Sequence, residues 1–204
     1  MKFAIIAACD DKRGIGIQNR LPWRLKLDLA YFSEVTTMAS EGKRNAVIMG
    51  RNTWLSLPEK HRPLADRLNV VLSKEEMDLP EGVLRAVSFE DAFAQIAKDA
   101  GVDQTFVIGG ANVYAQAMNL EECDEIYLTR VLGEFQCDTF FPEIPINFKI
   151  VKESKVSEEN GVKFKFVIYG KETTVKNSTA KKIMKFVNPL LKELFIDFIA
   201  GLLT

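Results

Sequence analysis

The chain has 204 residues, 47% of them hydrophobic and 27% charged, with a formal net charge of −1. This composition is that of an ordinary globular domain, and the near-neutral charge gives no reason to expect a nucleic-acid partner. Cys9, Cys123 and Cys137 are odd in number and far apart, which favours neither a disulfide framework nor a zinc site. The first apolar run, of about seven residues, is too short to span a membrane. We therefore expect a cytoplasmic protein without a transmembrane segment or a bound metal.

Apolar runs and helical patterns alternate along most of the chain. The patterns predict strands at 2–9, 45–50, 67–73, 104–110 and 124–131, and helices at 25–38, 89–100 and 111–119. Continuous apolar strands separated by helices indicate a mostly parallel sheet that is covered on both faces. Residues 148–156 and 162–170 alternate more clearly and predict an antiparallel hairpin at the C-terminal edge of the sheet. The expected fold class is therefore α/β, with a mixed central sheet flanked by helices.

The last part of the chain differs in composition from the rest. A polar, linker-like stretch begins at residue 172, and Asn188-Pro189 then provides an N-cap and a proline at the first helical position. The expected helix is amphipathic, with one face formed by Leu191, Leu194, Phe195, Phe198 and Leu202. We predict a domain at 1–171 and a tail of linker and helix at 172–204. The apolar face favours self-association or docking on the domain over contact with a membrane surface.

A carboxylate stands on an apolar stripe in the helix after Pro22-Trp23. Leu25, Leu29 and Phe32 follow the i, i+4, i+7 spacing, and Asp28 falls on the same stripe. A buried carboxylate is costly, so Asp28 is expected to cap or hydrogen-bond, to pair with a cation, or to serve chemistry.

Three expected strands end in sequences suited to anions. "VIMGRNTW" (47–54) and "FVIGGANVY" (106–114) pass from strand through glycine to a helix start, and "VVLSKEE" (70–76) ends its strand with Ser73-Lys74. Each alone is ordinary turn chemistry. Together, at the carboxyl ends of parallel strands, they favour a dinucleotide with several phosphates.

The single histidine, His61, lies in the proline-flanked turn "LPEKHRPL". We expect it to be a solvated turn residue. A Ser-His-Asp triad or a multi-histidine metal site is therefore not expected.

The ordered motifs resemble the dihydrofolate reductase family. They are "GIG" (14–16), "LPW" (21–23), "LDLAYF" (27–32), "VIMGRNTW" (47–54), "RPLADRLNVVLS" (62–73), "VIGGANVY" (107–114), "YLTR" (127–130) and "DTFFPEI" (138–144). The resemblance covers roughly residues 2 to 171. It implies NADPH-dependent reduction of 7,8-dihydrofolate, with hydride going to C6 and a proton to N5, and binding of antifolate inhibitors.

The resemblance also implies roles for individual residues around the substrate. Asp28 matches the active-site acid that binds the amino-pyrimidine edge and helps to deliver the proton, and Thr129 matches the threonine that hydrogen-bonds it. Arg67 matches the arginine that holds the α-carboxylate of the substrate's glutamate. The remaining substrate contacts implied are Ile6, Ala7, Leu29, Phe32, Leu57, Ile108 and Tyr114.

For the cofactor, Arg51, Ser73 and Lys74 match the 2′-phosphate site, which favours NADPH over NADH. The family has a cis peptide between the two glycines of the pyrophosphate loop, here Gly109 and Gly110. The other implied cofactor contacts are Ala8, Ile15, Gly16, Gly50, Asn52, Thr53, Ala111, Asn112 and Val113. Residues 14–21 match the lid over the nicotinamide, and Asp138 matches the acid that latches this lid in bacterial members.

Two features depart from the family pattern. The motifs look eukaryotic, yet the acid is an aspartate, as in bacterial enzymes and in protozoan enzymes fused to thymidylate synthase. Ordinary single-domain members lack the tail, which is open to three interpretations: a remnant of a linker to a fused or partner thymidylate synthase, a self-association helix, or an artificial extension.

Two other functions compete with dihydrofolate reduction. The NADPH-dependent pyrimidine reductase of riboflavin synthesis, a related reductase, shares the fold but lacks the pairing of "LPW" with "LDLAYF". A folate-binding protein without turnover is disfavoured by the intact acid and phosphate residues.

Overall fold

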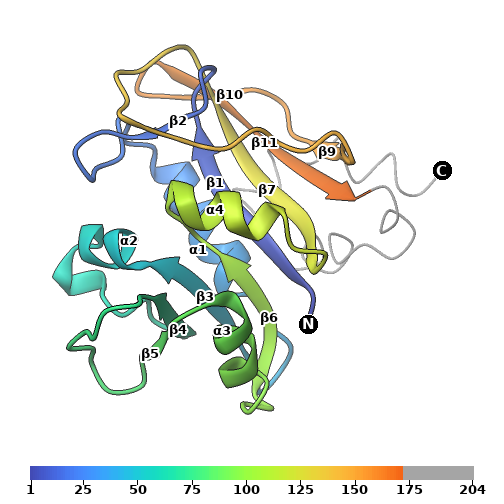
Figure 1. The fold of residues 1–204 in the computed structure, drawn as a ribbon. Coiled ribbons are helices and arrows are strands. Elements are labelled where there is room, and N and C mark those ends of the chain that lie inside the picture. The colour runs from blue at the N-terminus through green and yellow to red at the C-terminus, as the bar shows by residue number, and fades with distance from the viewer. Residues whose placement is uncertain (172–204) are drawn as a thin grey trace.

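The computed structural model describes residues 1–171, and its centre is one nine-stranded sheet in the order β10-β11-β7-β1-β6-β3-β4-β5, with β9 also paired to β11 (Figure 1). Its parallel strands are β1 (Phe3–Cys9), β3 (Arg44–Gly50), β4 (Arg67–Leu72), β5 (Leu84–Ala86), β6 (Val102–Val107) and β7 (Cys123–Leu132). Antiparallel pairing joins β11 (Val162–Lys171) to β7, β9 (Phe148–Glu153) and β10 (Ser157–Glu159). The predicted mixed, mostly parallel α/β fold is confirmed.

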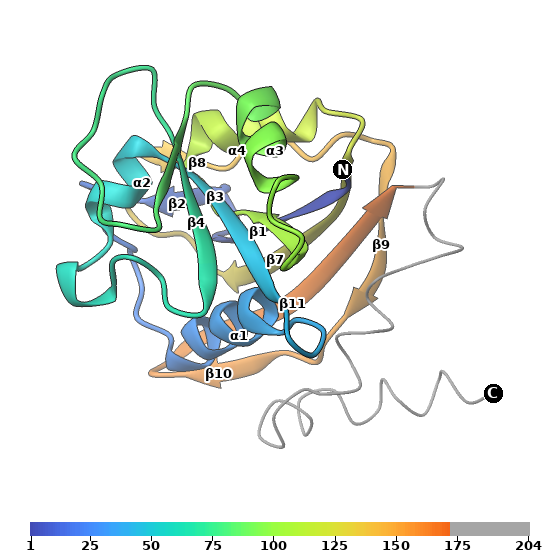
Figure 2. The same cartoon turned by 90° about the horizontal axis from the view of Figure 1, so that it is seen from below.

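Helices cover both faces of the sheet. α1 (Lys26–Thr37) lies on one face, and α3 (Phe89–Ile96) and α4 (Ala111–Met118) lie on the other (Figure 2). The short α2 (Arg51–Ser56) follows β3 directly. Because successive strand residues point to opposite faces, Val47 and Met49 join the core with α1, while Ala46 and Ile48 join the core with α3 and α4. This two-sided burial explains why the strands read as continuous apolar runs.

The buried face of α1 differs from the predicted stripe at one residue. Leu25, Asp28 and Val35 are buried, but Leu29 is 51% exposed, so its placement in a buried stripe was wrong. The helix is turned so that Tyr31 enters the core, where its ring stacks on Phe166 of β11 at 4.1 Å between centroids.

Several predicted boundaries were wrong. The strand predicted at 148–156 ends at Glu153, where the Ser154 Oγ accepts a hydrogen bond from the Phe166 N–H (3.0 Å) and interrupts the ladder, and a separate strand, β10, begins at Ser157. The helix predicted at 89–100 ends at Ile96. In the turn that follows it, the Asp99 Oδ1 accepts a hydrogen bond from the Gly101 N–H (2.8 Å). The strand predicted at 104–110 ends at Val107. Sequence reasoning missed β5 and the small ladder between β2 (Gly14–Gly16) and β8 (Thr139–Phe140).

His61 is exposed, as expected, and ends a single 3₁₀ turn (Glu59–His61). The amphipathic helix predicted within 172–204 lies outside the described residues. Within residues 1–171, none of the helices has the length and apolar character needed to cross a membrane.

Asn45 offers a test of how α1 is fastened to the sheet. Its side chain is fully buried, donates to the carbonyls of Thr36 (3.1 Å) and Met38 (2.8 Å), and accepts from the Gln104 N–H (3.1 Å). Asn45→Ala removes three hydrogen bonds to buried or partly buried backbone groups, so we expect it to lower the free energy of unfolding by about 3 kcal/mol in urea titrations. The exposed Asn119, which donates to the Ala115 carbonyl, is the matched control, and Asn119→Ala should cost less than about 0.5 kcal/mol. Equal losses would contradict this role.

Candidate active site

The carboxyl ends of the central strands meet at one edge of the sheet. β1 is parallel to both β6 and β7, and β3 is parallel to both β4 and β6, so all five strands end on the same side (Figure 1). The register places Ala8 beside Thr129 and Gly50 beside Leu72. In open α/β sheets this edge is where ligands bind.

Asp28 lies in the first turn of α1 and is buried, with 7% of its surface exposed. Thr129, from β7, hydrogen-bonds its carboxyl group. The pKa of Asp28 is raised to about 6, mainly by burial; the Thr129 hydrogen bond opposes the rise, and the negative charge of Glu159 contributes to it. Asp28 is therefore a carboxyl group that binds and releases a proton close to neutral pH.

Tyr114 and Trp23 are buried aromatic residues that carry polar atoms. Tyr114 donates to the Ile6 carbonyl (2.9 Å), and its pKa is raised by burial and, to a smaller extent, by the charges of Cys9 and Asp28. Trp23 packs edge-on against Phe135, with centroids 5.3 Å apart. The Trp23 Nε1 is buried and has no hydrogen-bond partner among the described residues, so it is a donor that a polar ligand atom could satisfy.

Arg67, the first residue of β4, contacts the C-terminal part of α1 through Thr36. Its Nη1 donates to the Thr36 Oγ1 (2.6 Å), its Nε donates to the Ala65 carbonyl (2.8 Å), and its Cζ lies 5.9 Å from the centre of the Phe32 ring. Partial burial lowers its pKa, but a guanidinium remains charged. Asp28 and Thr36 are two helical turns apart, or about 12 Å at 1.5 Å per residue. The Asp28 carboxyl group and the Arg67 guanidinium therefore lie near opposite ends of α1.

The glycines at the strand ends pack closely against one another. The peptide between Gly109 and Gly110 is cis, and Gly109 has a φ of +113°. The Gly50 N–H donates to the Gly109 carbonyl (2.7 Å), and a Cβ on Gly50 would lie 2.9 Å from the Val113 Cγ2. Side chains at these positions would separate β3 from the start of α4. The positive φ of Gly109 is incompatible with a strand, and β6 ends at Val107, before the glycines.

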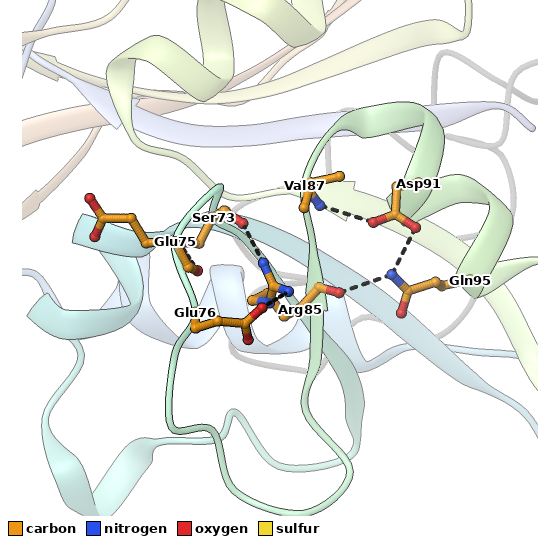
Figure 3. A network of polar contacts seen from close by, with 7 residues as sticks. All are labelled: Ser73, Glu75, Glu76, Arg85, Val87, Asp91 and Gln95. Carbon is orange, nitrogen blue, oxygen red and sulfur yellow. Dashed lines mark hydrogen bonds and ion pairs between the residues drawn. The ribbon is translucent and has the colours of Figure 1, made fainter.

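The loop after β4 is held by a polar network that includes residues sequence reasoning missed (Figure 3). Arg85, in β5, donates from Nη1 to the Ser73 carbonyl (3.3 Å) and from Nη2 to the Glu76 Oε1 (2.5 Å). Gln95 of α3 donates to the Arg85 carbonyl (2.9 Å) and to the Asp91 Oδ1 (3.0 Å). A lone arginine in a three-residue strand carries no pattern that would identify it. Its guanidinium fixes the loop that carries Ser73 and Lys74.

Arg51 and the Ser73 hydroxyl both interact with Glu75. The Arg51 Nη1 lies 3.0 Å from the Glu75 Oε2, and the Ser73 Oγ donates to the Glu75 carbonyl (2.8 Å). Lys74 is exposed. A hydroxyl and two cations are thus gathered near the ends of β3 and β4.

Two aspartates fasten the segment 14–21. The Gln18 N–H donates to the Asp138 Oδ2 (2.8 Å), and this bond lowers the pKa of Asp138. The buried Asp10, missed by sequence reasoning, accepts from the N–H groups of Gly14 (2.6 Å) and Lys12 (2.9 Å) through Oδ1 and of Phe135 (2.9 Å) through Oδ2. Asp138 therefore reaches the segment as the resemblance implies.

The remaining residues predicted from the resemblance lie along the same edge or near it. Leu57 follows α2 and is half-buried, Ile108 donates to the Ile48 carbonyl (2.9 Å), and a Cβ on Gly110 would lie 3.3 Å from the Thr53 Oγ1. The others lie at the ends of β1 and β2 or at the starts of α2 and α4: Ala7, Ala8, Ile15, Gly16, Asn52, Ala111 and Asn112.

The fold and this edge define an α/β protein with the buried acid Asp28 and closely packed glycine turns at its strand ends. A sequence model described as dihydrofolate reductase matches residues 2–171. Dihydrofolate reductase of Drosophila melanogaster is 42% identical over 181 residues, covering 85% of this chain and all of that protein; the Rattus norvegicus enzyme is 44% identical over 179 residues, covering 82% and 96%. The solved structure of Schistosoma mansoni dihydrofolate reductase has a TM-score of 0.74 and 36% identity, covering 83% of this chain and 98% of that one. The chain belongs to the dihydrofolate reductase family.

The raised pKa of Asp28 predicts a pH-dependent cost to stability. Between about pH 4 and 6 the folded chain holds a proton on Asp28 that the unfolded chain has released, so stability falls as pH rises through this window. The difference between 3.8 and about 6 corresponds to about 3 kcal/mol. Asp28→Asn should therefore raise the free energy of unfolding near neutral pH by up to that amount, and by much less near pH 4. Urea unfolding at both pH values measures this, and a gain independent of pH would contradict it.

Proposed function

We propose that this chain reduces 7,8-dihydrofolate to 5,6,7,8-tetrahydrofolate with NADPH as hydride donor, that residues 1–171 form the catalytic domain, and that the reaction takes place in the cytoplasm. Reduction of dihydrofolate is the reaction of the family, and the chain is an oxidoreductase by that membership. The free thiols of Cys9, Cys123 and Cys137 are consistent with a reducing compartment.

The observation that carries the proposal is the environment of Asp28. A pKa of about 6 leaves this carboxyl group partly protonated near neutrality, which suits a group that supplies a proton during reduction. The carboxylate would accept hydrogen bonds from the amino-pyrimidine edge of the pterin and assist proton delivery to N5. Thr129 holds the carboxyl in place from β7. Antifolates that carry the same amino-pyrimidine edge would bind at Asp28.

Arg67 would bind the other end of the substrate. Its guanidinium lies beside Phe32 and Thr36, about two helical turns from Asp28. That separation suits a ligand with a heterocycle at one end and a glutamate carboxylate at the other. The partly exposed Leu29, Phe32 and Leu57 would supply its apolar contacts.

The residues at the strand ends fit a dinucleotide. Gly50, Gly109 and Gly110 leave no side chain where the backbone of β3 and the start of α4 approach each other, and such backbone can lie close to a pyrophosphate. Arg51, Ser73 and Lys74 would bind the 2′-phosphate, and Ala8 and Ile15 the carboxamide. When bound, NADPH supplies the hydride that reaches C6 of the pterin.

The Asp28 assignment is tested by Asp28→Asn. We expect the variant to keep its NADPH affinity and to lose at least about 100-fold in hydride transfer near neutral pH, because no group then holds the proton. Partial recovery at low pH is expected, where the substrate arrives protonated. Single-turnover measurements at two pH values, with the exposed Asp78→Asn as control, decide the matter. Near-normal hydride transfer by Asp28→Asn at neutral pH would overturn the assignment. The overall reaction is tested separately, by measuring whether the unaltered chain oxidises NADPH in the presence of dihydrofolate and whether methotrexate inhibits that oxidation.

The 2′-phosphate assignment is tested by Arg51→Ala combined with Lys74→Ala. Each lost charged hydrogen bond weakens NADPH by about 1.5–3 kcal/mol, toward the lower end here because both side chains are solvated. The affinity for NADH should change little, since NADH lacks that phosphate. Titration with both cofactors gives the comparison, and equal losses would contradict the assignment.

A further inference from the structure

The start of α1 has no local cap. Its N-cap residue is Leu25, which has no side chain able to accept a hydrogen bond, so the first N–H groups of the helix need another partner. Glu159 provides it from β10: its Oε1 accepts from the Lys26 N–H (2.9 Å) and its Oε2 accepts from the Leu27 N–H (3.0 Å). Both oxygens of one carboxylate therefore cap a helix that begins more than 130 residues earlier.

The turn between β10 and β11 contributes a second contact. Asn160, with a φ of +53°, donates from Nδ2 to the Arg24 carbonyl at 3.3 Å. Glu159 and Asn160 together therefore hold the four residues Arg24 to Leu27, directly before Asp28. Figure 2 shows β10 lying along the same side of the sheet as α1.

This arrangement bears on where the Asp28 carboxyl group points. Asp28 is the third residue of α1, a position at which an acidic side chain commonly turns back to cap the helix. Here Glu159 occupies the N–H groups of the first two residues, and the Asp28 carboxyl group is instead hydrogen-bonded to Thr129 of β7. Glu159 thus caps the start of the helix without the Asp28 carboxyl group, which is bonded to Thr129 instead.

We propose that Glu159 is a positioning residue, whose carboxylate fixes the first turn of α1 from outside and places a permanent negative charge near the Asp28 carboxyl group. This inference rests on the proposed role of Asp28 in the reduction. It assigns to the β10–β11 hairpin a part in setting the pH range in which the enzyme works.

The electrostatics agree with that geometry. Bonds from Leu27 and Lys26 lower the pKa of Glu159, so it stays ionised throughout the range in which Asp28 titrates. Its charge raises the pKa of Asp28, and it is the one charged side chain among the described residues identified as doing so. The other groups facing Asp28 are Thr129 from β7, which lowers the pKa, and the neutral hydroxyls of Tyr31 on α1 and Tyr114 on α4. Lys26 stands beside Glu159 on the solvent side.

The test compares Glu159→Gln with Glu158→Gln in the full chain. Glutamine keeps one acceptor for the helix and removes the charge, so the pKa of Asp28 should fall by a few tenths of a pH unit, since Glu159 is near solvent. The alkaline decline of hydride transfer should move to lower pH by the same amount. The exposed neighbour Glu158 carries the same charge without contacting α1, and its variant should leave the profile unchanged.

A second variant separates the cap from the charge. Glu159→Ala removes the acceptor as well, so we expect hydride transfer to fall about five- to tenfold while the affinity for NADPH is unchanged. Where Glu159→Ala folds poorly, NMR titration of the Asp28 carboxyl carbon in Glu159→Gln measures the same effect directly.

The outcomes distinguish this inference from the proposed function. The double variant Asp28→Asn, Glu159→Gln should have the same pH profile of hydride transfer as Asp28→Asn alone, because the titrating carboxyl group of Asp28 is absent from both. If Asp28→Asn behaves as expected but Glu159→Gln matches Glu158→Gln, the inference about Glu159 is wrong and the proposed function stands. If Asp28→Asn leaves hydride transfer unchanged, the proposed role of Asp28 is wrong, and the inference about Glu159, which rests on it, is wrong as well.

Discussion

The burial of one carboxyl group, Asp28, is the constraint on which the site depends. A carboxyl group that is held away from water and bonded to Thr129 retains its proton to about pH 6, two pH units above an exposed aspartic acid. The fold maintains this costly placement by packing α1 against β3 and β11 through Tyr31 and Val35. A stable core thus supports a locally unfavourable group, as expected where chemistry is performed.

The sequence predicted those parts of the fold that depend on local pattern. Continuous apolar strands such as 45–50 showed that both faces of the sheet are covered, and the helix starts after Gly50 and Gly110 were located to the residue. The break at Ser154 could not be predicted, because it arises from a hydroxyl that bonds a backbone group in the neighbouring strand. The exposure of Leu29 was missed for a similar reason, since spacing along a helix does not fix which way the helix is turned against a sheet.

The same distinction applies to the site. Asp28, Arg51 and the paired glycines stand in recognisable motifs, so they could be predicted as site residues from the sequence. Arg85, Asp10 and Glu159 act through backbone groups that only the folded chain brings near them. No local pattern marks such residues, although they determine where the recognisable ones lie.

The carboxylates that hold the segment 14–21 and the start of α1 both bind main-chain N–H groups, Asp138 at Gln18 and Glu159 at Lys26 and Leu27. Every amino acid except proline supplies that N–H. A change of side chain at these three positions therefore leaves the bonded N–H in place, within the limits set by the left-handed φ of +49° at Gln18 and the packing of Leu27 against the core. A change at Asp138 or Glu159 itself removes the attachment.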